Sequence, residues 1–308
     1  YHAGLIGEYL IERYANIHVS VDLASEFRYR DPEIDERILV IVVSQSGETA
    51  DTLAALRLAR KKGACALAIC NVVGSTIARE ADAVIYTQAG PEIAVASTKA
   101  YTSQITTFCL LTVFLGRMTA HLSRAAARSF LVDLERVADK VETLLQQKQL
   151  HRGVKRIARR YCCTKYFLYV GRNINYPTAL EGALKLKEIC YISSEGYAAG
   201  EMKHGPIALA YDKLPVFVIA PESDIYDKMF SNIREIKARR ADILAVVTAG
   251  DRRIGSVAKV VVQVPRTIEF LSPLITIVPL QLVAYAISCT LGYDPDKPRN
   301  LAKSVTVE

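Results

Sequence analysis

LVIVVSQSGET, residues 39–49, is the stretch that decides the fold of this chain. It begins with a short apolar run rich in β-branched side chains, a pattern that predicts a buried strand of a parallel sheet. Small hydroxyl residues and Gly47 follow, and a helix is predicted from about Glu48 to Lys62, where Gly63 ends it. A strand that runs directly into a helix is the first half of a βαβ unit.

The same order of elements occurs twice along the chain. The first half carries predicted strands at 39–43, 66–70 and 84–86 and predicted helices at 3–14, 48–62 and 100–116. About 177 residues later, strands are predicted at 216–220, 243–248 and 260–264 and helices at 224–240 and 274–292. Glu92 and Glu269 fall at this same spacing, each shortly before an uncharged helix. We therefore predict an α/β protein of two doubly wound parallel-sheet domains related by an internal repeat.

The domain boundaries follow from this repeat. We expect a first domain at 1–122, a helical connector at 123–150, a second domain at 151–298 and a C-terminal tail at 299–308. In the second half, a predicted strand at 166–170 and a turn precede the helix that corresponds to residues 3–14. A matching strand and turn are expected upstream of Tyr1, so the first domain is predicted to be truncated at its N-terminus.

Composition and cysteine content indicate a reduced, globular protein. Half of the residues are apolar (51%) and 23% are charged, which excludes a disordered or collagen-like chain. The seven cysteines form no Cys-x-x-Cys pair, so neither a disulfide framework nor a zinc site is indicated. Because free thiols are typical of reducing compartments, we expect a cytoplasmic protein.

The charge and hydropathy patterns favour neither nucleic acid nor a membrane as a partner. The net charge of +7 favours nucleic acid, but the basic clusters are spread along the chain, near predicted helix ends, and lack interleaved aromatic side chains. A small anionic substrate accounts for the positive charge equally well. Residues 100–116 and 270–293 carry no charge, yet their Pro, Gln, Ser and Thr residues favour buried helices over membrane spans. We therefore expect neither partner.

The polar residues after the first strand form a candidate anion site. Ligands of doubly wound sheets bind at the carboxyl ends of the strands, where Ser44, Gln45, Ser46 and Thr49 lie. Backbone N–H groups of such a turn and the N-terminus of the next helix attract phosphate. An ordinary Ser/Thr N-cap is the alternative. Residues 221–224, their equivalents, carry two carboxylates that would repel phosphate, so the anion site is predicted only in the first half.

Two further segments gather acidic, basic and imidazole side chains. Glu181, Lys185 and Glu188 fall at i, i+4 and i+7 of one predicted helix, which places them on one face. This spacing alone is consistent with a catalytic group and equally with an exposed ion pair. His204 lies in the Gly-bounded segment 195–206 beside further charged residues, and a structural histidine is the alternative there.

Five blocks of sequence resemble one enzyme family. They read SQSGETADTL (44–53), PEIAVASTK (91–99), ALEGALKLKEI (179–189), YAAGEMKHGP (197–206) and DKPRNLAKSVTVE (296–308). In this order they resemble the glutamine–fructose-6-phosphate aminotransferases, also called glucosamine-6-phosphate synthases. The resemblance covers the sugar-phosphate isomerase half of that family, which is built of two flavodoxin-like sugar-isomerase (SIS) domains. The family's glutaminase domain, and a Cys-Gly-Thr-Ser turn that contacts phosphate, find no counterpart in these residues.

The resemblance implies a role for each block. It implies that Lys303 forms a Schiff base with the C2 ketone of fructose 6-phosphate, which requires a neutral amine. Glu188 would move a proton between C1 and C2, and Lys185 would stabilise the developing charge. His204 would assist ring opening from the neighbouring subunit. The implied phosphate ligands are Ser44, Gln45, Ser46 and Thr49. The implied backbone contacts to the sugar are Val95 and Ala302.

The resemblance also implies the partners of the chain. These are fructose 6-phosphate and glucosamine 6-phosphate as ligands, a second subunit in a homodimer with a shared site, and a glutaminase domain that supplies ammonia; no metal or organic cofactor is implied. Two alternatives stay open: a sugar-phosphate deglycase or isomerase of the same superfamily, and a regulatory SIS module that senses sugar phosphate without catalysis. The Lys303 tail argues against the sensor, which needs only the phosphate loop.

Overall fold

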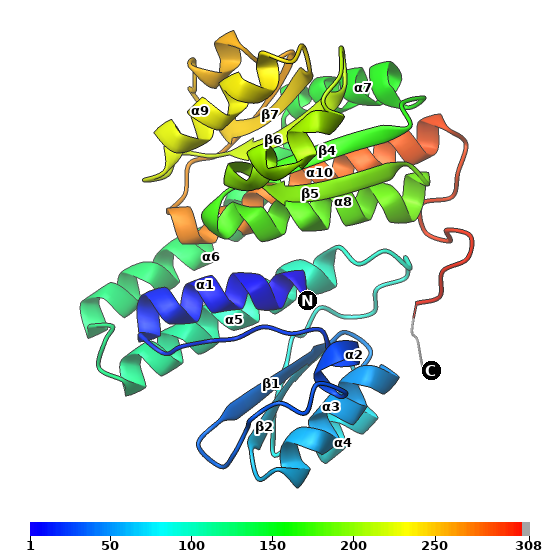
Figure 1. Cartoon of the computed structure of the whole chain (residues 1–308). Coiled ribbons are helices and arrows are strands. Elements are labelled where there is room, and N and C mark those ends of the chain that lie inside the picture. The colour runs from blue at the N-terminus through cyan, green and yellow to red at the C-terminus, as the bar shows by residue number, and fades with distance from the viewer. Residues whose placement is uncertain (304–308) are drawn as a thin grey trace. The chain divides into compact units, whose positions relative to one another are not determined.

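Two parallel sheets flanked by helices make up the computed structural model of this protein (Figure 1). The structure describes residues 1–303, so residues 304–308 of the predicted tail 299–308 lie outside the described residues. The chain forms two units. Unit 1 comprises Tyr1, Ala3–Arg124 and the chain from Asn300, and unit 2 comprises His2 and Ala125–Arg299.

Unit 1 is built on a sheet of parallel strands in the order β1-β2-β3. Its elements are α1 (His2–Ala15), α2 (Ala24–Phe27), β1 (Leu39–Ser44), α3 (Ala50–Lys61), β2 (Cys65–Cys70), α4 (Thr76–Glu80), β3 (Ala83–Tyr86) and α5 (Lys99–Met118). Helix α3 packs against β1 and β2, and α4 packs against β2. Their common core includes Val42, Leu56 and Ile77, so the apolar side chains of the first strand are used as the sequence predicts.

Two glycines let α1 and α5 approach each other closely. A Cβ at Gly7 would lie 2.5 Å from a ring carbon of Phe108, and a Cβ at Gly116 would lie 2.5 Å from the backbone oxygen of Tyr14. Any side chain at either position would push the helices apart. Because α5 also contacts β2, this pair of helices completes the core of unit 1.

Unit 2 is built on a sheet of parallel strands in the order β5-β4-β6-β7-β8. Its longer elements are α6 (Arg124–Gln146), α7 (Lys148–Tyr161), β4 (Tyr166–Gly171), α8 (Tyr176–Cys190), β5 (Ser193–Ala198), β6 (Pro215–Ala220), α9 (Tyr226–Lys237), β7 (Asp242–Thr248), β8 (Val260–Val264) and α10 (Ser272–Thr290). Short 3₁₀ turns are η1 (Asn173–Asn175), η2 (Ala199–His204), η3 (Pro206–Leu209), η4 (Ile254–Ser256) and η5 (Glu269–Leu271). The stretch 123–150 is occupied mainly by α6.

Alternate residues of β4 pack on opposite faces of this sheet. Tyr169 stacks on Phe217 with ring centroids 4.9 Å apart and lies against Gly182 of α8. Leu168 points to the other face, where it shares a core with Ile233 of α9. Both faces of the central strands are therefore buried, which explains why they are almost entirely apolar.

Helix α10 is the most apolar helix of unit 2. Among the described helices, the stretch Glu269–Thr290 alone is long and apolar enough to cross a membrane, but 72% of its apolar window is buried inside the protein. It contacts α7, α8 and β8. This burial agrees with the prediction of a buried core helix in 270–293.

The predicted fold class is confirmed by the two sheets. Strands β6, β7 and β8 repeat β1, β2 and β3 in order and in parallel direction, with α9 and α10 in the places of α3 and α5. Each predicted strand agrees with the observed one to within one residue at either end. The repeat makes Ser44 and Ala220 the ends of equivalent strands, and it directs attention to the loops that follow them.

Candidate functional site

The predicted anion site of unit 1 is a compact turn between β1 and α3. The amide of Gly47 donates to Ser44 Oγ at 3.1 Å, and the amide of Glu48 donates to Ser46 Oγ at 3.2 Å. Ser44 Oγ also lies 3.1 Å from Thr49 Oγ1. The turn thus gathers three hydroxyl groups at the carboxyl end of a strand, where an anion would find several donors.

Gly47 fits this turn for two reasons. Its φ is +69°, a left-handed conformation that favours glycine, and a Cβ there would lie 2.0 Å from Ser75 Oγ. Backbone hydrogen bonds fix the turn against the end of β2 and the start of α4: Gln45 O accepts from the amide of Asn71 at 3.2 Å, and Gly47 O accepts from the amide of Ile77 at 3.0 Å. The turn is therefore preformed.

Helix α3 begins directly after the turn. Thr49 is its N-cap residue, but no side chain within residues 1–303 caps the helix, so the first amides are available to a ligand. The Glu48 carboxylate is engaged elsewhere, because it accepts from the Thr76 amide at 2.8 Å, a bond that lowers the pKa of Glu48. Asp51 pairs with Arg28 at 3.0 Å. The nearby carboxylates therefore have partners, and the helix N-terminus favours an anion.

The equivalent loop of unit 2, residues 221–224, carries two carboxylates in place of hydroxyl groups. Glu222 pairs with Arg266 at 2.6 Å, and its amide donates to Thr248 Oγ1 at 2.8 Å. The amide of Asp224 donates to Glu269 at 3.3 Å. Carboxylates thus occupy the place where the loop of unit 1 offers hydroxyl groups.

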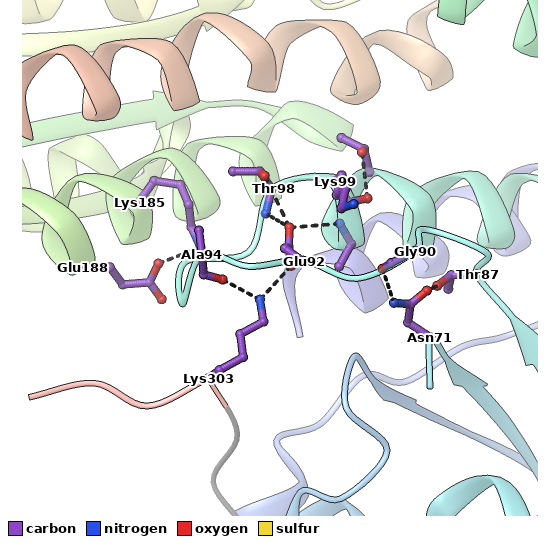
Figure 2. A network of polar contacts seen from close by, with 12 residues as sticks. Asn71, Thr87, Gly90, Glu92, Ala94, Thr98, Lys99, Lys185, Glu188 and Lys303 are labelled. Carbon is purple, nitrogen blue, oxygen red and sulfur yellow. Dashed lines mark hydrogen bonds and ion pairs between the residues drawn. The ribbon is translucent and has the colours of Figure 1, made fainter. Parts of the chain in front are cut away.

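The C-terminal segment from Asn300 brings Lys303 to the stretch between β3 and α5 (Figure 2). Lys303 Nζ donates to Glu92 Oε2 at 2.8 Å and to the carbonyl oxygen of Ala94 at 2.7 Å. Val95, a predicted sugar contact, is the next residue along the chain. Ala302, the other predicted contact, precedes the lysine and is exposed. Unit 1 therefore brings the predicted Schiff-base amine to a predicted sugar-binding segment.

Glu92 is anchored at the start of α5. Its side chain is 4% exposed, and its Oε1 accepts from the Thr98 amide at 2.7 Å and from the Ala100 amide at 3.3 Å. Burial alone would raise the pKa of Glu92, but the hydrogen bonds from Lys303 and Thr98 outweigh burial and hold it below its usual value. The carboxylate is therefore ionised and rigidly placed.

Helix α8 carries the predicted acid and base residues of unit 2. Lys185 Nζ lies 3.2 Å from Glu181 Oε1 and 2.6 Å from Glu188 Oε2, the second pair being drawn in Figure 2. His2 Nδ1 lies 2.7 Å from the other oxygen of Glu181. The interpretation of this spacing as an exposed ion pair is wrong, because the Lys185 side chain is only 3% exposed.

Lys185 and Glu188 differ in charge and in accessibility. Burial lowers the pKa of Lys185, but the carboxylates of Glu181 and Glu188 outweigh burial and raise it above its usual value. Lys185 is therefore a fixed positive charge. Glu188 is the more accessible carboxylate, with 22% of its side chain exposed, so it is the member that a ligand can reach.

His204 lies at the end of η2 and is exposed. Gly205 follows with a φ of +132°, a conformation that favours glycine and turns the chain directly after the histidine. No contact between described residues joins His204 to Lys185 or Glu188. Unit 2 therefore brings the lysine and the glutamate together but leaves the imidazole on its surface.

Neither a metal centre nor a surface hollow among the described residues includes the predicted site residues. Within residues 1–303, no three His, Cys, Asp or Glu side chains come together in a way that could hold a metal ion. A hollow of about 460 Å³ lies along α7 and is lined by Arg152, Lys155, Arg156, Arg159 and Arg160. One helix supplies this whole lining, so the hollow is an exposed basic face that contains none of the predicted site residues.

Sequence reasoning assigned no role to Glu92, although it binds the Lys303 amine. A signal was present, because Glu92 belongs to the block 91–99 and has Glu269 as its counterpart in the repeat. The partner could not be found from spacing, since 211 residues separate Glu92 from Lys303.

Comparison with a family model supports the internal repeat. The model described as "SIS domain" matches residues 1–114 and 161–291. These two ranges contain β1–β3 of unit 1 and β4–β8 of unit 2. The same kind of domain therefore occurs twice in the chain.

Individual relatives agree with that match. The chain is 51% identical over 308 residues to a glutamine–fructose-6-phosphate aminotransferase (isomerizing) of Chlorobaculum tepidum, covering 100% of this chain and 50% of the relative. The chain thus spans about half the length of the curated relatives it matches. Among solved structures, the C-terminal domain of glucosamine-fructose-6-phosphate aminotransferase from Francisella tularensis matches with a TM-score of 0.91 and 35% identity. That match covers 96% of this chain and 84% of the other.

A more distant solved structure shares the fold alone. Glucosamine-6-phosphate deaminase from Thermotoga maritima matches with a TM-score of 0.75 and 22% identity, covering 99% of this chain and 86% of that one.

Proposed function

Because this chain belongs to the SIS domain family and, within it, to the isomerase regions of glutamine–fructose-6-phosphate aminotransferases, we propose that it makes glucosamine 6-phosphate. The reaction consumes fructose 6-phosphate and ammonia and releases water. The observation that carries this proposal is the Lys303 amine, which is bound at Glu92 and Ala94 in the unit that also holds the phosphate turn. A module that only senses sugar phosphate has no use for such an amine.

Substrate binding is assigned to unit 1. The phosphate accepts from the hydroxyl groups of Ser44, Ser46 and Thr49 and from the first amides of α3, while Gln45 completes the turn. The open helix N-terminus and the engaged Glu48 carboxylate support this assignment. The backbones of Val95 and Ala302 contact the sugar.

Covalent chemistry is assigned to Lys303. The neutral amine adds to the C2 carbonyl carbon, the carbonyl oxygen takes a proton, and loss of water leaves an imine. Ammonia then adds to the imine carbon and displaces the lysine, which leaves as the free amine. This exchange produces fructosimine 6-phosphate without any oxidant or reductant.

Proton transfer is assigned to unit 2. The Glu188 carboxylate removes a proton from C1 of the fructosimine while the imine nitrogen takes a proton, which gives an enolamine. The Glu188 carboxylic acid exchanges its proton with solvent in part and delivers a proton to C2, and the C1 hydroxyl loses its own proton, which gives the aldose. Lys185 stabilises the negative charge that develops in between. The fixed charge of Lys185 and the accessibility of Glu188 support these roles.

The proposal extends to a cytoplasmic homodimer supplied with ammonia by a glutaminase domain. The relatives' printed names contain glutamine, which supports glutamine as the nitrogen source. Helix α5 leaves Leu110, Phe114 and Met118 exposed at i, i+4 and i+8, an apolar stripe that a second subunit would cover. His204, exposed in unit 2, would then act in the partner's site. All seven cysteines are free, which supports a reducing compartment.

A coupled assay tests the proposed activity. The chain is incubated with fructose 6-phosphate, and glucose 6-phosphate formed by ketose–aldose isomerisation is oxidised by a dehydrogenase that reports as NADPH. Added ammonium should divert product to glucosamine 6-phosphate. Glu188→Gln should abolish both products, whereas Glu142→Gln, at an exposed position on α6, should change neither. Binding of fructose 6-phosphate without either product would contradict the proposal and support a sensor.

A further inference from the structure

The two carboxylate oxygens of Glu92 have separate partners. Oε1 accepts from the Thr98 and Ala100 amides at the start of α5, and Oε2 accepts from Lys303 Nζ. The carbonyl oxygen of Ala94 is the second acceptor of the same amine. We call the Glu92 carboxylate and the Ala94 carbonyl the lysine clamp. Because one oxygen is fixed by helix amides, the other is held in a set position for the amine.

The internal repeat shows that binding an amine is not a requirement of the fold. Glu269 is the counterpart of Glu92 and also precedes a long apolar helix. Its oxygens accept from Asn173 Nδ2 at 3.1 Å and from the amide of Asp224 at 3.3 Å. No lysine is among its contacts in the part of the chain that the structure describes. The same carboxylate therefore has a structural use in one half and binds an amine in the other.

We infer that Glu92 is a positioning residue, which with Ala94 holds the Lys303 amine at the sugar-binding segment until the sugar arrives. This inference rests on the proposed function, because the imine of Lys303 gives the lysine clamp its use. Lys303 itself remains the residue that touches the substrate, and Glu92 acts through it.

The lysine clamp has two opposite consequences for the reactivity of the amine. A charged acceptor at 2.8 Å and a carbonyl at 2.7 Å both accept from the N–H groups of the amine and hold it in place, so the amine is protected from reagents in solution while no sugar is bound. The same contacts restrict the Lys303 side chain, which otherwise samples many rotamers, and they hold its amine at Ala94, the residue before Val95. An amine that starts beside its target reacts faster than one that must find it. Removal of the carboxylate should therefore raise reactivity toward reagents in solution and lower reactivity toward the bound sugar.

The first arm of the test needs no substrate. The full chain is labelled with trace acetic anhydride at pH 8, and acetylation of Lys303 is measured by mass spectrometry. In Glu92→Gln, whose amide oxygen can still accept from the helix amides, Lys303 should be labelled about ten times faster than in wild type, since the charge-assisted hydrogen bond that holds the amine is lost. Glu269→Gln is the matched control and should leave the rate unchanged.

Lys99, the first residue of α5, separates positioning from mere fraying of the helix. If Glu92→Gln only loosens the start of α5, labelling of Lys99 rises together with that of Lys303. A rise confined to Lys303 supports the lysine clamp, and a parallel rise or no rise overturns it. Glu92→Asp, whose carboxylate is one methylene too short to reach both sets of partners, provides a second variant with the same expectation if Glu92→Gln does not fold.

The second arm measures how fast Lys303 forms an imine with the bound sugar when the lysine clamp is present or absent. With saturating fructose 6-phosphate and cyanoborohydride, which reduces imines, the adduct on Lys303 should form at least about ten times more slowly in Glu92→Gln, with unchanged affinity for the sugar phosphate. Faster labelling with an unchanged trapping rate would overturn the positioning role. If wild type forms no adduct either, the proposed function fails together with the positioning role, while the acetylation arm still reports whether Glu92 binds the amine.

Discussion

Replacement of Lys185 by Met tests the buried charge cluster of α8. Methionine resembles lysine in length but carries no charge, so it fills the space while the Glu181 carboxylate, 6% exposed, loses its amine. Breaking a buried ion pair costs about 3–5 kcal/mol, because the remaining charge stays buried without a partner. His2 still contacts Glu181 at 2.7 Å. We therefore expect the free energy of unfolding of unit 2 to fall by about 3 kcal/mol at pH 7, the lower end of that range.

The loss of stability in Lys185→Met should be smaller at low pH than at pH 7. Burial raises the pKa of Glu181, but Lys185 and His2 outweigh burial and hold it below its usual value. A depressed folded-state pKa gives stability that is present above the unfolded pKa, about 4.3, and lost as pH falls through the folded pKa. Without Lys185 burial dominates, the folded-state pKa of Glu181 exceeds the unfolded one, and acidification favours the folded variant. The difference in unfolding free energy between variant and wild type should therefore narrow between pH 7 and pH 4.5.

Urea unfolding followed by far-UV circular dichroism and tyrosine fluorescence measures this gap at both pH values. Lys187→Met is the matched control, because Lys187 is exposed on the same helix two residues away. It should change the free energy of unfolding by less than about 0.5 kcal/mol. If Lys185→Met is as mild as this control at pH 7, or if its gap to wild type does not narrow at pH 4.5, the buried cluster does not carry the charges assigned to it.

Three further predictions concern the turn and the carboxylate. Gly47→Ala should destabilise unit 1 by at least about 1 kcal/mol more than Gly74→Ala in thermal melts, since both adopt positive φ but only the first meets Ser75 Oγ; equal effects would show that the contact is unimportant. Thr49→Ala should weaken binding of fructose 6-phosphate in calorimetry by about 1–3 kcal/mol, because the phosphate loses a donor, and unchanged binding would remove Thr49 from the site. Glu188→Gln should stop solvent deuterium exchange at the sugar, followed by NMR, while calorimetric affinity stays nearly constant; exchange at the wild-type rate would place the base elsewhere.

The fold was predictable because its signals are local. The β-branched run at 39–43 and the turn after it identify a strand and a helix within a short window, and their recurrence at 216–220 predicts the second sheet. Gly47 and its hydroxyl neighbours mark the turn as a candidate anion site in the same way. These features depend on sequence neighbours, so no tertiary information is needed.

The state of the site was not predictable in the same way. Spacing places Lys185 between two carboxylates, but its burial depends on how α8 packs against β4, β5 and α10, which no local pattern records. The contact of Lys303 with Glu92 joins residues 211 positions apart. His204 illustrates the remaining gap, since the role proposed for it requires a second subunit, and a single chain shows only an exposed imidazole.

The most direct test of the proposed function is the position of the imine. The chain is incubated with fructose 6-phosphate and borohydride, digested and mapped by mass spectrometry, with Lys303→Arg as the control that keeps the charge but cannot form an imine. We predict one reduced sugar-phosphate adduct per chain, on Lys303, and none in Lys303→Arg. An adduct on any other lysine, or one that persists in Lys303→Arg, would contradict the proposal that the tail amine carries the reaction.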